Sequence, residues 1–168
     1  MIQSIMGHHK LLLDDDIKEE FSLVAIHCSE EAYKMAYLIN SHLGLRLLRE
    51  DVDLDYSNDG LEVTFPLFHY KDNVHYTTYH LVANKCKSLE ANVLSSGGLF
   101  GDDASEKTMT TYLLPEYRKV DFFLKVFSEF STIPLRKIIS NINEIKQVIS
   151  AYSLEIVNIK SKNNLIFD

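Results

Sequence analysis

The sequence of 168 residues lacks the features that mark several large classes of protein. It has no tryptophan, only three prolines and only two cysteines, Cys28 and Cys86, which fall outside any metal-binding or redox pair. We therefore expect neither a disulfide-stapled fold nor a zinc-stabilised one. No apolar run reaches the length of a membrane span, and the first residues lack the apolar core of a signal peptide, so the sequence predicts a soluble cytoplasmic protein.

An excess of basic residues is also missing. The chain carries 17 Lys and Arg against 24 Asp and Glu, a net charge of −7, and its basic residues are scattered. Proteins that bind nucleic acid usually present a basic face, because contacts to phosphate supply most of the affinity. The acidic balance disfavours nucleic acid as a partner and leaves open only a local basic patch.

Catalytic signatures are absent from the sequence as well. There is no G-x-S-x-G nucleophile elbow and no Rossmann glycine fingerprint. His27 and Cys28 are neighbours on a predicted strand, where successive side chains point to opposite faces, so they do not form a dyad. The sequence leans against an enzyme and predicts no cofactor.

Hydrophobic residues, at 46%, are enough for one core, and the length predicts a single domain over 1–168. Apolar and helical periodicity predicts a strand at 21–28, a helix at 29–44 and a strand at 45–50. A second strand–helix–strand unit follows at 120–130, 134–148 and 149–159. Each helix has an apolar stripe expected to face the core: Ala32, Met35, Ala36, Ile39 and Leu43 in the first, and Leu135, Ile138, Ile139, Ile142, Ile145 and Val148 in the second. Between the units, 61–70 and 74–86 predict a hairpin, in which Pro66 marks an edge or a bulge, and 108–114 predicts a further strand.

These elements predict an α+β fold. We expect a mostly antiparallel sheet with two main helices on one face, a ferredoxin-like sandwich built from the two strand–helix–strand units. Residues 160–168 are expected to form a tail.

A short polar stretch, "LPEYRKVDF" at 114–122, separates two of the predicted strands. It resembles the signature of the IPExxxVDY family of Bacteroidetes-type bacteria, with Leu for Ile, Phe for Tyr, and matches at Pro115, Glu116, Val120 and Asp121. Similar stretches are "AYLINSHLGLRLLR" (36–49), "NKC" (84–86), "SSGGLF" (95–100) and the end of the chain. The resemblance implies one intact domain in a bacterial cytoplasm and implies no activity.

The same stretch has two interpretations. As a corner in the fold, Pro115 would open a helical turn, Glu116 would lie near the amide end of that turn, and Asp121 would pair with Arg118 or Lys119 or accept from backbone amides. As a binding site, Pro115, Glu116 and Asp121 would face a partner. We favour the corner, because a short polar stretch between strands is usually a turn.

Three further patterns are candidates for ligand binding. In "SSGGLFGDD" the backbone amides at Gly97 and Gly98 could cradle an anion, although no phosphate-loop ending follows. "DVDLDYSNDGLE" (51–62) partly matches a calcium loop, but Tyr56 stands where that loop needs glycine. A strand with Val52, Leu54 and Tyr56 facing inward, followed by a turn, is favoured. Histidines 69, 75 and 80 fall on the predicted hairpin; His69 and His75 could face each other across its turn, but packing roles are favoured and no metal site is predicted.

The leading functional hypothesis is a non-enzymatic protein-interaction or adaptor domain, either as a homodimer or with another protein. One alternative is a small-ligand or anion-binding regulatory domain, by analogy with other ferredoxin-like sandwiches. The second is an RNA-associated protein, because an aromatic-rich sheet can stack bases. A closed polar pocket would favour the ligand-binding hypothesis, and a basic face would favour the RNA hypothesis. An exposed apolar patch or an open sheet edge would favour a protein partner.

Overall fold

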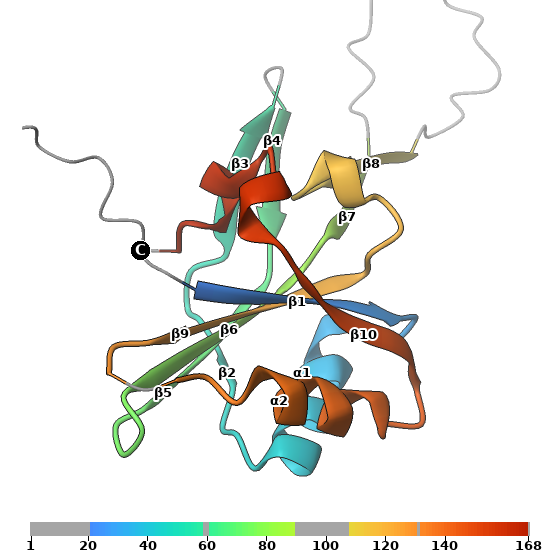
Figure 1. The fold of residues 1–168 in the computed structure, drawn as a ribbon. Helices are drawn as coiled ribbons and strands as arrows, with labels where there is room; N and C mark the ends of the chain where they lie inside the picture. Colours follow the sequence, from blue (N-terminus) through green and yellow to red (C-terminus); the bar gives the residue numbers. More distant parts are fainter. Residues whose placement is uncertain (1–20, 59–60, 90–107, 131, 168) are drawn as a thin grey trace, which may run out of the picture.

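Six antiparallel strands form the main sheet, in the order β10-β1-β9-β6-β5-β2 (Figure 1). The computed structural model describes residues 21–58, 61–89, 108–130 and 132–167. The elements of the main sheet and its helices are β1 (Phe21–Cys28), α1 (Ala32–Leu43), β2 (Leu48–Arg49), β5 (Leu67–Asp72), β6 (Thr77–Ala83), β9 (Phe122–Ser128), α2 (Leu135–Asn143) and β10 (Val148–Leu154). Two further hairpins and three short 3-10 helices complete the described chain: β3 (Leu54–Asn58), β4 (Leu61–Phe65), β7 (Lys85–Leu89), β8 (Thr108–Tyr112), η1 (Pro115–Tyr117), η2 (Ile156–Asn158) and η3 (Lys162–Leu165).

The centre of the sheet has the ferredoxin-like arrangement that the sequence predicts. Strands β10, β1, β9 and β6 lie side by side, so that β9 separates β1 from β6 and β1 separates β9 from β10. Helices α1 and α2 lie together on one face of this sheet (Figure 1). The α+β class, the antiparallel sheet and the placement of the helices are therefore confirmed.

The strand predicted at 45–50 is only two residues long and does not close the first unit. Leu48 and Arg49 pair with β5 at the outer edge of the sheet, and the parallel strand that lies one strand away from β1 is β6, much later in the chain. Both side chains of this short strand are exposed, so no apolar face holds a longer strand there.

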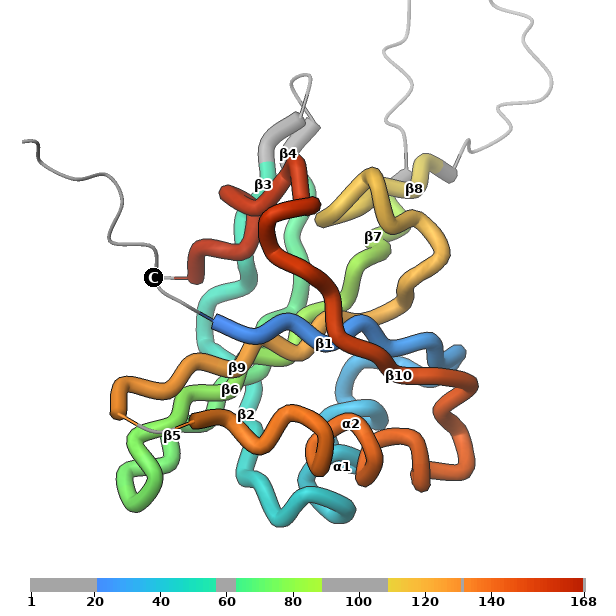
Figure 2. The backbone as a smooth tube through the Cα atoms, viewed as in Figure 1, coloured from blue at the N-terminus to red at the C-terminus, as the bar shows by residue number. Residues whose placement is uncertain are grey.

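Each strand of the predicted long hairpin is broken in two. Pro66 has no backbone N–H to donate, and at this point the chain leaves the β3–β4 hairpin and enters β5 of the main sheet. Asn84 separates β6 from β7, which pairs with β8 in a second small sheet. The two breaks lift β4 and β7 away from the main sheet, where they cover the face opposite the helices (Figure 2).

Hydrophobic clusters fill both faces of the sheet. Phe122, Leu124 and Val126 of β9 pack under the helices, whereas Phe123 points to the opposite cluster, as alternation along the strand predicts. The second cluster is closed by β3–β4 and by the segment after β10, whose Ile159 and Leu165 are almost fully buried. Leu165 belongs to the predicted tail, which therefore contributes to the core, whereas the strand predicted to reach 159 ends at Leu154.

The apolar stripes of both helices are confirmed. Met35, Ala36 and Ile39 of α1 are buried, and Gly44 ends the helix with a left-handed φ of 66°, the geometry glycine favours. Helix α2 ends at Asn143 instead of continuing toward 148, and its stripe is extended into the core by residues of the next turn and strand. In the described part of the chain, neither helix is long and apolar enough to cross a membrane.

Candidate functional site

The stretch 114–122 forms a tight corner between β8 and β9. Leu114 has extended backbone angles, Pro115 occupies the first position of the 3-10 turn η1, and the Tyr117 N–H donates to the Leu114 carbonyl at 2.9 Å. Proline suits that position because its fixed φ matches the turn and its missing N–H is not needed there. A further turn follows, in which the Val120 N–H donates to the Tyr117 carbonyl at 2.9 Å.

Asn84 fixes this corner through hydrogen bonds from its side chain and its backbone. Its side chain is fully buried and makes three hydrogen bonds of 2.8–2.9 Å, and its backbone N–H and carbonyl make two more of 2.8 Å. The partners, all in or beside the corner, are Leu113, Leu114, Tyr117, Val120 and Asp121. One asparagine therefore satisfies most of the backbone groups that the corner would otherwise leave buried and unpaired.

Glu116 points from η1 to the segment after β10. Its carboxylate accepts from the Ser161 backbone N–H at 2.8 Å and from the Ser161 hydroxyl at 2.9 Å. Partial burial alone would raise the pKa of the Glu116 carboxyl, but the hydrogen bonds from the backbone amides and hydroxyl outweigh it and hold that pKa below its usual value. Glu116 is thus ionised and ties the C-terminal segment to the corner.

Asp121 is engaged on both oxygens. Oδ2 accepts from the Cys28 N–H at 2.9 Å and Oδ1 from the Lys85 ammonium at 2.7 Å. Its ionic partner is therefore Lys85 of β7, not Arg118 or Lys119 as the sequence suggested; both of those side chains are exposed. Burial, with the nearby acidic groups, raises the pKa of the Cys28 thiol, so this cysteine stays protonated and is a poor nucleophile.

The structure thus brings Pro115, Glu116 and Asp121 together in one corner and commits both carboxylates to internal hydrogen bonds. Gly97 and Gly98, the other predicted binding residues, lie outside the described residues. Sequence reasoning missed Asn84 and Ser161 as members of the corner. Both lie in stretches that carry the family resemblance, "NKC" (84–86) and "KSKNNLIF" at the end of the chain. This shared resemblance was the sequence signal that could have linked them to the corner.

Histidines 69 and 80 lie directly opposite each other on β5 and β6. Their ring centroids are 4.9 Å apart, and His69 Nδ1 is 3.1 Å from a Glu50 carboxylate oxygen. His69 and His75, for which the sequence left open a facing pair, do not face each other, because His75 is in the hairpin turn and binds Asp72 at 2.7 Å. Burial, with His69 and Lys125 nearby, lowers the pKa of His80 to about 4.

No group of three or more metal-ligating side chains is arranged to hold a metal ion in the residues that the structure describes. The strand interpretation of the calcium-like stretch is confirmed, because β3 pairs with β4 from Leu54 opposite Phe65 to Asn58 opposite Leu61. Leu54 and Tyr56 pack on the second core cluster as that interpretation requires. Val52, expected inside, precedes the strand and is exposed.

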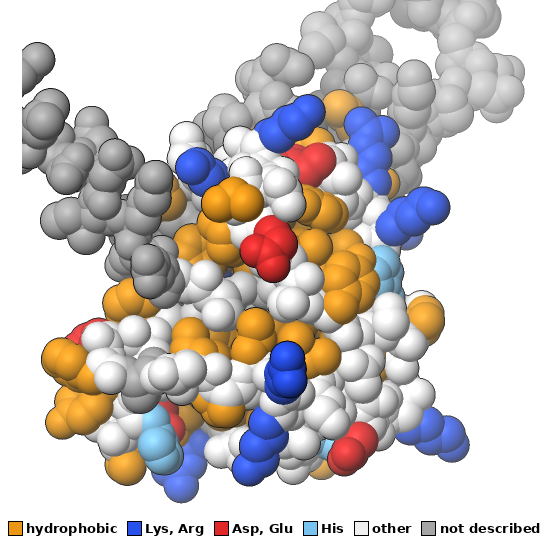
Figure 3. All heavy atoms as spheres, viewed as in Figure 1, with side chains coloured by type: hydrophobic (Ala, Val, Ile, Leu, Met, Phe, Trp, Pro, Cys, Tyr) orange, Lys and Arg blue, Asp and Glu red, His pale blue; other side chains and the backbone are white. Residues whose placement is uncertain are grey.

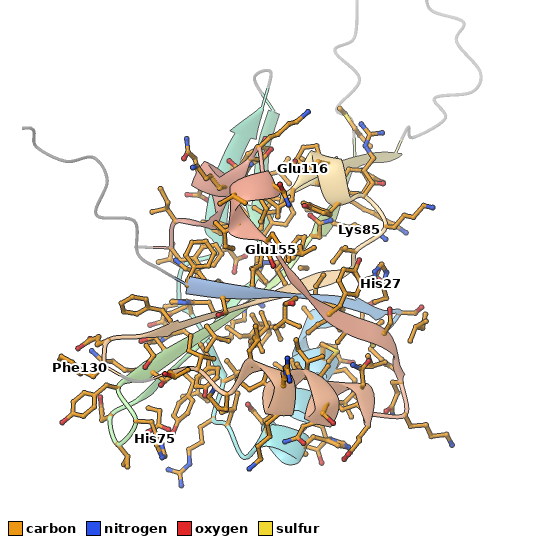
Figure 4. All side chains as sticks on the ribbon, viewed as in Figure 1. His27, His75, Lys85, Glu116, Phe130 and Glu155 are labelled. Carbon is orange, nitrogen blue, oxygen red and sulfur yellow. The ribbon has the colours of Figure 1, made fainter. Side chains whose placement is uncertain are left out.

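An exposed aromatic surface lies at the end of the sheet where the β5–β6 turn meets the end of β9. It consists of Val74, Tyr76 and Phe130, which we call the aromatic tip, and which are 80%, 53% and 78% exposed. The rings of Tyr76 and Phe130 meet edge to face with centroids 5.3 Å apart. Figure 4 shows Phe130 projecting from the molecule beside the turn that carries His75.

Comparison with protein-family models, curated proteins and solved structures found no match to this chain. The resemblance to the IPExxxVDY family therefore stays a prediction that rests on the motif.

Proposed function

We propose that this protein is a non-enzymatic protein-interaction domain that binds a partner through the aromatic tip. The observation that carries the proposal is the backbone of Tyr76, whose φ of 51° is the one left-handed φ at a non-glycine residue among the described residues. For an L-residue other than Gly, Asn or Asp this conformation costs about 1–2 kcal/mol. The fold tolerates this backbone strain at a position that presents a large exposed side chain, a pattern typical of functional surfaces.

The turn itself is well built, which makes the choice of tyrosine more informative. Asp72 Oδ1 accepts from the N–H groups of Val74 and His75 at 2.9 and 3.2 Å, and the Tyr76 carbonyl accepts from the Glu129 N–H at 3.1 Å. Glycine or asparagine at position 76 would satisfy the same turn without the strain. The aromatic ring adds no burial to the core, so a role at the surface is the better explanation.

Two other observations support a protein partner over the alternatives. The sheet face opposite the helices, where an RNA-binding sandwich would stack bases, is covered by β3–β4 and by the segment after β10. The carboxylates of the 114–122 corner, where a ligand site would need free groups, are bound within the chain.

Strand addition at the β10 edge is disfavoured, so side chains rather than backbone are the proposed contact. Asn143 of α2 donates to the Ala151 carbonyl at 2.9 Å and accepts from the Ala151 N–H at 2.8 Å. This side chain occupies the centre of the outer edge as a neighbouring strand would, which is one way proteins block edge pairing.

The test compares wild type with Tyr76→Asn and Phe130→Ser. Tyr76→Asn should keep or raise the melting temperature, because asparagine tolerates the left-handed conformation, and both variants should weaken binding of the partner recovered by cross-linking and mass spectrometry from native cells. Sedimentation of the purified protein distinguishes a homodimer from a different partner.

The matched control is Tyr33→Asn with Tyr37→Ser, which removes two exposed tyrosines of α1, 71% and 63% exposed, and should leave the same partner bound. The proposal fails if the control abolishes binding while the tip variants do not. It also fails if Tyr76→Asn lowers the melting temperature strongly, since tyrosine would then be required by the fold.

A further inference from the structure

A band of Lys and Arg side chains surrounds the 114–122 corner. Figure 3 shows blue side chains at the end of the molecule that holds η1 and the C-terminal segment, and others at the opposite end beside the helices. We call this band the basic corner; its six members are Lys85, Lys87, Arg118, Lys119, Lys160 and Lys162.

Hydrogen bonds, a cation–π contact and strand pairing join the three segments that carry these cations. The Glu116–Ser161 hydrogen bonds bring Lys160 and Lys162 beside η1. Arg118 lies over the ring of Tyr112, 5.5 Å from its centroid, and Tyr112 pairs with Lys85 across β7 and β8. These contacts hold the three segments that carry the basic corner next to one another in the fold.

The charge of this surface is opposite to that of the protein. The whole chain has a net charge of −7, whereas the segments 85–88, 109–121 and 155–167 hold six cations and three carboxylates. Two of those carboxylates, Glu116 and Asp121, are occupied by Ser161, Cys28 and Lys85. Within the described ranges no salt bridge engages Lys87, Arg118, Lys119, Lys160 or Lys162.

We propose that the basic corner binds an acidic segment of a protein. Complementary charge steers such a segment to this locally positive part of an acidic molecule. Arg118, held against the Tyr112 ring, presents its guanidinium with little freedom to lose, and the flat guanidinium binds a carboxylate through two hydrogen bonds.

RNA is also negatively charged, but the described residues of the basic corner do not present the aromatic rings that single-stranded RNA stacks on. Proteins that bind single strands combine a basic groove with aromatic rings on which bases stack. Among the described residues, Tyr112 lies beneath Arg118 and Tyr117 packs against Phe123, while the exposed aromatic rings belong to α1, to the aromatic tip and to β10.

The test measures binding of fluorescent oligoglutamate to the full chain by anisotropy, with oligouridylate of equal charge as the competitor. We expect binding that weakens with salt, and a loss of about tenfold or more in the variant Arg118→Glu with Lys160→Glu. The matched control, Lys137→Glu with Lys146→Glu, makes the same charge change on exposed lysines of α2 and the turn after it, and should lose about threefold or less. Melting temperatures establish that all variants fold.

Two results would overturn the proposal. Equal losses in both double variants would show an effect of net charge alone, and tighter binding of oligouridylate than of oligoglutamate would assign the surface to nucleic acid. The tip variants Tyr76→Asn and Phe130→Ser should bind oligoglutamate like wild type, so this inference and the proposed function succeed or fail separately.

Discussion

The Glu116 carboxylate accepts two hydrogen bonds from Ser161, 45 residues further along the chain. A glutamate in the turn after a proline suggests a local role at the amide end of that turn. The structure uses it instead for a long-range contact that fixes the C-terminal segment over the second core cluster, next to Ile159 and Leu165.

Glu116→Gln should lower the free energy of unfolding by about 0.5–1.5 kcal/mol, because neutral hydrogen bonds replace charge-assisted ones at a largely exposed site. The loss should appear at neutral pH and vanish toward low pH. The folded-state pKa of Glu116 is lowered, so its contribution is present above the ordinary carboxyl pKa and is lost as the pH falls through the folded value. Denaturant melts at pH 7 and pH 3 measure both effects.

The control for this variant is Glu155→Gln, which changes an exposed carboxylate on the same side of the molecule (Figure 4). It should melt like wild type at both pH values. A Glu116→Gln variant as stable as wild type at pH 7 would show that the Ser161 contact contributes nothing to folding.

Asn84→Ala should be far more damaging, with a loss of about 3–5 kcal/mol, because three buried backbone groups of the corner would lose their partners. Urea unfolding followed by circular dichroism measures the loss. Asn158→Ala, at an exposed position of η2, is the matched control and should change stability by less than about 0.5 kcal/mol. A small effect at Asn84 would mean that water replaces its side chain in the corner.

Asp121 and Lys85 should be coupled. A double-mutant cycle with Asp121→Asn and Lys85→Met is expected to give about 0.5–1 kcal/mol, since the pair is partly exposed but well aligned at 2.7 Å. The more exposed pair Arg49 and Asp53, also 2.7 Å apart, serves as the comparison and should give less. Coupling of zero for Asp121 and Lys85 would leave the Cys28 N–H as the main partner of Asp121.

Ile142→Ala tests the helix face that periodicity predicted. Ile142 is fully buried between α2 and the sheet, so its truncation should cost about 2–5 kcal/mol in denaturant unfolding. Ile149→Ala removes the same atoms from an exposed position of β10 and should cost less than about 0.5 kcal/mol. Equal losses at the two positions would contradict the assignment of the buried face.

The fold was predictable where one local pattern decides the structure. The helix stripe through Met35 and Ile39 and the alternation along β9 each report which side is apolar, and the sheet and helix layers follow from them. The strand at 45–50 was over-predicted because Leu48 is apolar but has nothing to pack against, and only tertiary structure reveals that.

The corner was predictable as a turn but not as a network. Pro115 predicts the turn from its fixed backbone geometry alone. The partners of Glu116 and Asp121, in contrast, are Ser161 and Lys85, which are distant in sequence. Opposite charges nearby in sequence, such as Arg118 and Lys119, were the only partners that spacing could suggest. Long-range hydrogen bonds leave no periodic signal in one sequence.

The environment of His80 predicts how the stability of the protein depends on pH in the acidic range. Its ring is mostly buried between His69 and Phe167, and its Nδ1 has no hydrogen-bond partner. Burial first, then the neighbouring His69 and Lys125, lower its pKa from 6.5 to about 4. Between pH 6.5 and about pH 4, His80 binds a proton in the unfolded chain but not in the native protein. Lowering the pH over this range therefore favours unfolding.

The stability of the wild type should therefore fall as the pH drops from about 6.5 to about 4. The part due to His80 should be on the order of 1–2 kcal/mol, once solvent screening of the partly exposed ring is taken into account. His80→Gln removes the titrating group and should flatten this part of the profile, whatever its effect at neutral pH. His42→Gln, at an exposed position of α1, is the control and should keep the wild-type slope. An unchanged slope in His80→Gln would mean that this histidine is protonated in the native protein and that the sheet opens to water around it.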